Sequence, residues 1–301
     1  MGSIRKIKKI LQGKPTIEGA GVHLKRAFGR PEVPQFDPFL MLDDFHSNNP
    51  AHYLPGFPWH PHRGIETITY VFEGRVEHGD SLGNKGGIGP GDLQWMSAAS
   101  GIIHQEMPKL NQTGGIWGLQ FWANLPANQK MSAPRYRDVK AADIPEVILD
   151  GGVRIKIIAG RVANVQGPVN DIAIDPEMLD VSLSPGAVFE RAIPSGHTVF
   201  AYIVDGEACF GDTGAAHGLD DSSPDTPDRE RRGGCAAQSV ALFEPEGNVV
   251  QISSKDHRAR FVLVSGKPIG EPIAWQGPIV MNTPEELETA FDELRFGTFV
   301  K

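Results

Sequence analysis

Two short motifs contain the side chains in this chain best suited to bind a metal ion. The first is His60-Pro61-His62, followed by Glu66, and the second is His104-Gln105-Glu106. Side chains alternate along an extended segment, so each motif is predicted to present both end residues, and the first also Glu66, to one face. Neutral imidazole and carboxylate groups bind iron, copper, nickel, zinc or manganese.

A barrel that brought the two motifs together would form a metal site with open positions. Three imidazoles and one carboxylate leave room for water or substrate on a six-coordinate ion, which is typical of catalytic sites. An isolated His-x-His pair is more often structural than metal-binding. The prediction of a metal site therefore depends on the presence of the second motif. The other histidines have no partner at useful spacing and are interpreted as structural: His23, His46, His52, His78, His197, His217 and His257.

The elements around these motifs are predicted to be short strands. Glycine occurs 35 times and proline 24 times, at short intervals between β-rich runs, which is typical of an all-β sandwich or barrel. The predicted strands are Glu66–Phe72, Leu93–Met96, Ile102–Met107, Trp117–Trp122, Val153–Ile158, Val181–Leu183, Thr198–Val204, Val249–Ser253 and Arg260–Val264.

One helix is predicted near the end of the chain. Thr283-Pro284-Glu285-Glu286 provides an N-cap, a proline at the first helical position and a capping-box glutamate. Leu287, Ala290, Phe291 and Leu294 follow at helical spacing and are expected to form its buried face.

An internal repeat indicates two similar barrels. Tyr70–Gly74 followed by Gly79-Asp80 matches Tyr202–Gly206 followed by Gly211-Asp212, each a strand that enters an acidic-glycine turn. A boundary is expected within residues 126–145, a polar, proline-rich stretch, which gives domains of residues 1–135 and 136–301. The charged segment Asp212–Gly234 is expected to be a long surface loop.

Composition excludes several classes of protein. The formal net charge of −8 argues against a dedicated nucleic-acid binder, and the basic run Arg5–Lys9 is interpreted as an edge strand. Two cysteines are too few for a disulfide framework, and Cys209, in an apolar run, is expected to be a buried thiol, while the state of Cys235 stays open. No apolar run reaches the length of a membrane span, so a cytoplasmic location is expected, or a nuclear one in a eukaryote.

Several segments resemble the pirin family of cupin proteins. The similar segments are Phe39–Phe45, His60–Gly64, Pro90–Met96, Gly101–Pro108, Trp117–Pro126 and Pro278–Thr283. The resemblance extends over nearly the whole chain and is densest in residues 37–126.

The resemblance implies two cupin (jelly-roll-like) β-barrels, with one metal ion in the first. Transferred residue by residue, the ligands would be His60, His62, His104 and Glu106, with Glu66 near the metal but not bound to it. In the register of the repeat, Ala192 and Pro194 replace the first two histidines, so the second barrel is expected to bind no metal.

The activity that the resemblance implies is that of a quercetin 2,3-dioxygenase, which opens a flavonol ring with O2 and releases carbon monoxide. Fe(II) is the preferred metal, with copper, nickel, cobalt, manganese and zinc as alternatives. Glu106 would take the proton of the flavonol hydroxyl as general base. Side chains expected to form the apolar pocket wall are Phe45, Phe57, Trp59, Trp95 and Met96.

A second hypothesis is an iron-dependent, redox-sensing binding protein that regulates transcription or a metabolic enzyme through a protein partner. A basic strip near the metal, to which Lys25, Arg26 and Arg30 could contribute, would favour it, whereas a deep pocket would favour the enzyme. A metal that only stabilises the barrel is a third hypothesis. A monomer is expected in each case, as in most pirins.

Overall fold

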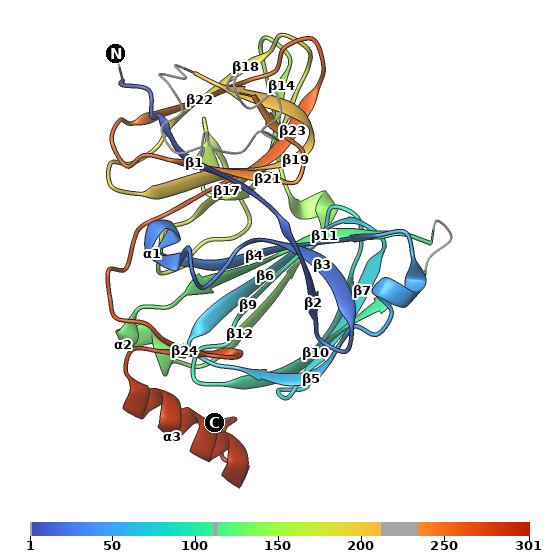
Figure 1. Ribbon diagram of the computed structural model, residues 1–301, viewed down its shortest axis with the longest axis vertical. Helices are drawn as coiled ribbons and strands as arrows, with labels where there is room; N and C mark the ends of the chain where they lie inside the picture. The colour runs from blue at the N-terminus through green and yellow to red at the C-terminus, as the bar shows by residue number, and fades with distance from the viewer. Residues whose placement is uncertain (1, 111–113, 212–233) are drawn as a thin grey trace, which may run out of the picture. The chain divides into compact units, whose positions relative to one another are not determined.

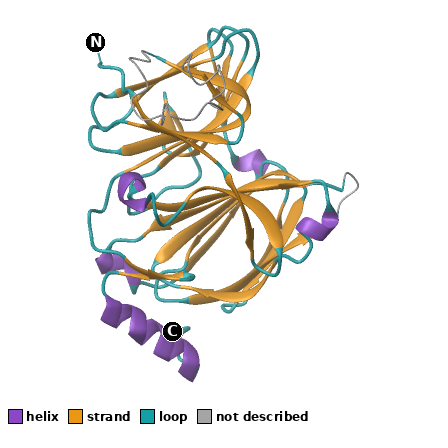
Figure 2. Ribbon diagram, viewed as in Figure 1, coloured by secondary structure: helices purple, strands orange, loops and turns teal. Residues whose placement is uncertain are grey.

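The computed structural model describes residues 2–110, 114–211 and 234–301, and these consist mainly of β-strands (Figures 1 and 2). The described part contains three short α-helices, so the predicted all-β fold with a C-terminal helix is confirmed. The surface loop expected at 212–234 lies outside the described residues, apart from Gly234. No described helix has both the length and the apolar character needed to cross a membrane.

The chain forms two compact units, residues 14–143 with 269–301 and residues 1–13 with 144–268. The change between residues 143 and 144 lies within the stretch 126–145 where a boundary was expected. The assignment of the two chain ends differs from the predicted domains, residues 1–135 and 136–301. Residues 1–13 belong to the later unit and residues 269–301 to the earlier one. Residues 1–13 join the later unit because β1 (Ile7–Gln12) hydrogen-bonds to β21 (Ser239–Phe243), at an edge of the sheet.

The unit of residues 14–143 and 269–301 is built from two sheets. The larger sheet has the strand order β12 (Arg135–Val139), β9 (Leu93–Ser97), β6 (Ile65–Glu73), β11 (Ile116–Asn124), β4 (Phe39–Ser47), β3 (Val22–Phe28) and β2 (Lys14–Glu18). The smaller sheet has the order β5 (Phe57–His62), β10 (Ile102–Lys109), β7 (Arg75–Asp80) and β8 (Lys85–Ile88). The remaining elements are α1 (Val33–Phe36), the 3-10 turns Pro50–His52 and Ala141–Asp143, α2 (Ala127–Lys130), the pair β24 (Ala274–Gln276) and β25 (Ile279–Met281), and α3 (Pro284–Phe296).

The other unit contains one large sheet around a core of Val, Ile, Leu and Phe side chains. Its strands, besides β1 and β21, are β13 (Glu146–Leu149), β14 (Val153–Ala159), β17 (Glu177–Leu183), β18 (Val188–Ala192), β19 (Thr198–Phe210), β20 (Gly234–Ala236), β22 (Val249–Ser253) and β23 (Ala259–Gly266). A separate pair is formed by β15 (Arg161–Val162) and β16 (Val165–Gln166). Cys209 and Cys235 are both buried in this unit, and the described residues contain no disulfide.

The C-terminal helix forms where the sequence predicts it. The Thr283 hydroxyl accepts a hydrogen bond from the Glu286 amide (3.2 Å), and the Glu286 carboxylate accepts one from the Thr283 amide (3.1 Å). These reciprocal bonds satisfy amide donors that have no partner within the helix. Ala290 packs with Ile279 and Met281 of β25, which attaches the helix to the unit formed by residues 14–143.

The turn between β5 and β6 depends on Gly64. Its φ of +76° is unfavourable for other residues, and a Cβ there would lie 1.9 Å from the Val280 carbonyl oxygen. The missing side chain lets β25 approach, so that the Val280 amide donates to the Arg63 carbonyl oxygen (3.1 Å). The turn also separates β5 from β6, so side-chain alternation does not continue from one strand to the next.

A buried lysine fixes the same turn. The Lys130 ammonium donates to the Gly64 carbonyl (2.8 Å), the Asn124 side-chain carbonyl (2.6 Å) and the Val280 carbonyl (3.0 Å). Burial lowers the pKa of Lys130 to about 7, while three acceptors favour the ammonium form, which alone has three N–H donors. Lys130 therefore connects the turn, the end of β11 and the C-terminal segment.

Replacing Lys130 should destabilise this unit selectively. We expect Lys130→Met to lower its free energy of unfolding by about 3 kcal/mol, since three buried acceptors lose their donor. All five tryptophans lie in residues 14–143 and 269–301, so urea unfolding followed by tryptophan fluorescence reports on this unit. Lys109→Met, which removes a half-exposed ion pair with Glu77, is the control and should cost less than about 1 kcal/mol. Equal losses in the two variants would contradict the role assigned to Lys130.

Candidate metal centre

The structure brings His60, His62 and His104 together on the smaller sheet. β5 and β10 pair antiparallel, with His60 directly opposite His104 and His62 opposite Ile102. One ring nitrogen from each of the three imidazoles lies within 4.8 Å of the other two. The register of one strand pair therefore assembles a group able to hold a metal ion.

The hydrogen bonds of these rings leave lone pairs that face one another. The Nδ1 atoms of His60 and His62 donate to the carbonyl oxygens of Pro58 (2.8 Å) and Pro278 (3.2 Å), which can only accept. Each Nε2 of a neutral ring is then an unprotonated acceptor, yet the two Nε2 atoms are 3.0 Å apart. Neither nitrogen of the buried His104 has a hydrogen-bond partner among the described residues. A cation between the rings would satisfy all three, so these residues fit a metal ion.

The protonation state of the histidines also suits a cation. Burial lowers the pKa of His60, and burial together with the neighbouring imidazoles places the pKa of His62 and His104 well below the usual value. The rings are therefore neutral at pH 7 and available as ligands without losing a proton.

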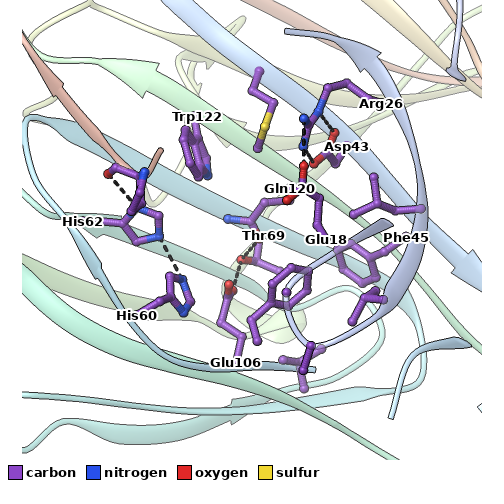
Figure 3. Close-up of a pocket in the computed structure, with 18 of the residues that line it drawn as sticks. Glu18, Arg26, Asp43, Phe45, His60, His62, Thr69, Glu106, Gln120 and Trp122 are labelled. Atoms are coloured by element: carbon purple, nitrogen blue, oxygen red, sulfur yellow. Dashed lines mark hydrogen bonds and ion pairs between the residues drawn. The ribbon is translucent and has the colours of Figure 1, made fainter. Parts of the chain in front are cut away.

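Glu106 lies two residues beyond His104 on the same buried face of β10. One oxygen of its carboxylate accepts a hydrogen bond from the Thr69 hydroxyl (3.0 Å), and burial raises the pKa of Glu106 to about 7. The carboxylate lines the same cavity as His60 and His62 but is not part of the group of three imidazoles within 4.8 Å (Figure 3).

Glu66 does not lie near the histidines, contrary to the sequence prediction. It is three residues from Thr69 on the regularly paired strand β6, and since Thr69 lines the cavity, Glu66 points to the opposite face of the sheet. There its carboxylate accepts a hydrogen bond from the Trp95 indole (3.1 Å), and burial raises its pKa to about 7. The prediction was wrong because the turn at Gly64 interrupts the alternation that begins at His60.

His60 and His62 line a cavity of about 670 Å³ between the two sheets. Of the predicted wall residues, Phe45, Phe57 and Trp59 line it. Trp95 and Met96 do not line it. Trp95 lies with Glu66 on the face of the sheet that points away from the cavity, and Met96 is packed in the core. Residues that the sequence prediction missed include Trp122 and, from the C-terminal segment, Trp275 and Pro278.

Arg26 also lines this cavity, and its charge is paired. Its guanidinium donates two hydrogen bonds of 2.8 Å to the Asp43 carboxylate and lies 3.0 Å from Glu18. Arg26 is therefore not the unpaired surface cation that a basic strip would require.

Comparisons with known proteins agree with this fold. Family models for Pirin and for the Pirin C-terminal cupin domain match residues 21–123 and 178–300. The chain belongs to the pirin family. A pirin-like protein of Caulobacter vibrioides is 43% identical over 98% of this chain and 99% of its own, and human pirin is 37% identical over 98% and 94%. A crystal structure of quercetin 2,3-dioxygenase from Acinetobacter baumannii superposes on this pirin with a TM-score of 0.85, at 29% identity, covering 99% and 100% of the two chains.

Metal affinity tests the three imidazoles. We expect His104→Ala to weaken binding of a divalent ion more than about 100-fold, because one of the three imidazole ligands is lost. Isothermal titration of the metal-free protein with Ni(II) measures the change. His257→Ala, outside the group, is the control and should bind as the wild type does. Unchanged affinity in His104→Ala would exclude the imidazole group as the binding site.

Proposed function

We propose that this pirin is a metal-dependent dioxygenase that opens the ring of a flavonol such as quercetin with O2. The observation that carries the proposal is the group of three neutral imidazoles, two of which, His60 and His62, line an aromatic-walled cavity. The similarity over the full chain to a quercetin 2,3-dioxygenase structure supports it. Fe(II) is the metal we propose, with copper, nickel, cobalt, manganese and zinc as ions that the same donors accept.

His60, His62, His104 and Glu106 are the ligands that we assign to the ion. When bound, a divalent metal supplies Lewis-acid polarisation of the substrate's hydroxyl and carbonyl oxygens and a centre for redox chemistry. Glu106 would take the proton from the flavonol hydroxyl as general base, and Thr69, hydrogen-bonded to its carboxylate (3.0 Å), would orient it.

The cavity wall has two tasks in this proposal. Phe45, Phe57 and Trp122 provide apolar surface against which a planar aromatic ring can pack. The same side chains exclude water from the deprotonated substrate, which strengthens its electrostatic interactions. Gly118 makes room for this wall, because a Cβ there would lie 2.3 Å from the ring of Phe45.

The structure favours this enzyme over the regulatory hypothesis. A regulator that binds an acidic partner would use unpaired basic side chains beside the site. Of the residues named for such a strip, Arg26 is bound to Asp43 and Glu18, and both Arg26 and Arg30 line the cavity. The cavity volume is also within the usual range for small-molecule sites.

Oxygen uptake is the direct test of the proposed activity. Anaerobically purified protein loaded with Fe(II) should consume O2 on addition of quercetin. The flavonol absorbance should fall at the same rate as O2 is consumed. His60→Ala should abolish both signals, since it removes one proposed ligand. Metal-loaded wild-type protein that consumes no O2 would contradict the dioxygenase and favour a redox-sensing binding protein.

The two roles of Glu106 can be separated by counting protons. In the metal-free protein its pKa is about 7, so at pH 6 the carboxyl holds a proton that metal binding must expel, whereas at pH 8 it is already ionised. We expect more protons to be released per Ni(II) at pH 6 than at pH 8, because the Glu106 carboxyl loses its own proton between these two values. Titration calorimetry in buffers of different ionisation enthalpy measures this release.

Glu106→Gln is the matched variant for both measurements. It should bind the metal with little proton release at pH 6 and lose turnover of quercetin by about 100-fold or more, since an amide cannot act as the base. Wild-type proton release in this variant would exclude Glu106 as a ligand, and wild-type turnover would exclude it as the base.

A further inference from the structure

The cavity has a charged end as well as a metal-binding end. Glu18, Arg26 and Asp43 line the wall on the side away from His60 and His62, and Figure 3 shows the two groups on opposite sides of the cavity. The proposed reaction uses none of these three side chains. We refer to Glu18, Arg26 and Asp43 as the charged cluster.

The geometry of the charged cluster is set by the sheet. Arg26 on β3 lies directly opposite Asp43 on β4, and the guanidinium binds both carboxylate oxygens at 2.8 Å. Glu18, at the end of β2, lies 3.0 Å from the remaining terminal nitrogen of Arg26. A bidentate pair held across two adjacent strands is rigid, so its free hydrogen-bonding positions point in fixed directions.

The charged cluster can accept more hydrogen bonds than it donates. Each carboxylate oxygen of Glu18 and Asp43 can accept about two hydrogen bonds, whereas the guanidinium of Arg26 is engaged by these two carboxylates and Arg30 adds a second cation to the cavity lining. The Arg26 hydrogen bonds occupy one position on each Asp43 oxygen. A ligand group that donates hydrogen bonds, such as a phenolic hydroxyl, therefore suits the free positions of Glu18 and Asp43, whereas a carboxylate has no proton to donate to them.

The wall between the two ends is apolar, with one polar position. Phe45 and Trp122 form aromatic surface, and Gln120, whose side-chain amide group lies 2.7 Å from the Thr69 hydroxyl oxygen, lies between Glu106 and the charged cluster. A ligand that reaches both ends would therefore be planar and apolar in its middle, with metal-binding oxygens at one end and hydroxyl groups at the other.

We infer that the charged cluster determines specificity by binding the hydroxyl groups at the end of the substrate remote from the metal. This inference rests on the proposed function and narrows its substrate class to uncharged, hydroxylated flavonols. It assigns to Glu18 and Asp43 direct contact with the hydroxyls, and to Arg26 the positioning of both carboxylates.

Three ligands with the same metal-binding oxygens test the inference. They are 3-hydroxyflavone, its analogue with 3′- and 4′-hydroxyls, and its analogue with a 4′-carboxylate. Dissociation constants are measured without oxygen on Fe(II)-loaded protein by quenching of tryptophan fluorescence, since Trp59, Trp122 and Trp275 line the cavity. Wild-type protein should bind the dihydroxylated analogue about tenfold more tightly than the parent, and the carboxylate about tenfold more weakly.

Two variants and one control assign these preferences to the charged cluster. Glu18→Gln and Asp43→Asn should each reduce both preferences at least about threefold. The Glu18 side chain is partly exposed, so its substitution should not disturb folding. Each preference is expressed relative to the affinity of the same variant for 3-hydroxyflavone, which has no group for the charged cluster. Glu77→Gln removes a surface carboxylate outside the cavity and should keep the wild-type preferences.

The outcomes separate this inference from the dioxygenase. Wild-type preferences in both Glu18→Gln and Asp43→Asn, or no preference in the wild type, would overturn the inference alone. Failure of all three ligands to bind the metal-loaded wild type would overturn flavonol recognition and the inference together. If the ligand preferences are as expected but the separate oxygen-uptake assay with quercetin shows no O2 consumption, the role of the charged cluster would be supported and the proposed oxidation overturned.

Discussion

The antiparallel pairing of β5 with β10 is the interaction on which the site depends. It places His60 opposite His104, and the two-residue period of the strands adds His62 and Glu106 to the same interior wall. β10 is also paired with β7 along its other edge, so its register is fixed on both sides. A slip of one residue would turn both of its proposed ligands to the other face. The donor group is therefore a property of sheet register rather than of a loop.

The end of the chain completes what the strands begin. The Pro278 carbonyl fixes the tautomer of His62, and Trp275 and Pro278 close one side of the cavity. Arg63, directly after His62, binds the Phe299 carbonyl (2.9 Å) and the carboxylate of Glu293 (2.6 Å). The buried cations Lys130 and Arg63 are thus used to hold the C-terminal segment against the strand that bears two histidines.

The parts of this structure that could be predicted from the sequence are those with local signatures. The alternation of Ile102–Met107 and the capping box at Thr283 each specify an element without help from distant residues. Glu66 was misplaced because alternation applies only within one strand, and Gly64 begins a new one. Pro278 could not be found, because a backbone carbonyl has no residue-type signature and its position depends on tertiary packing. The pairing of Arg26 was hidden for a similar reason, since it depends on which residue of β4 lies across the sheet.

Each unit contains a segment from the far end of the chain, which sets an order for its completion on the ribosome. Domains generally fold as units during synthesis, the N-terminal one first, yet neither unit here is complete until a distant partner has been made. Residues 14–143 emerge early with every proposed ligand, but the pair β24 and β25 follows only near the end of translation. A nascent chain therefore contains the imidazoles before it contains Trp275 and Pro278, which line the cavity. The cavity can close only after this later segment has been synthesised.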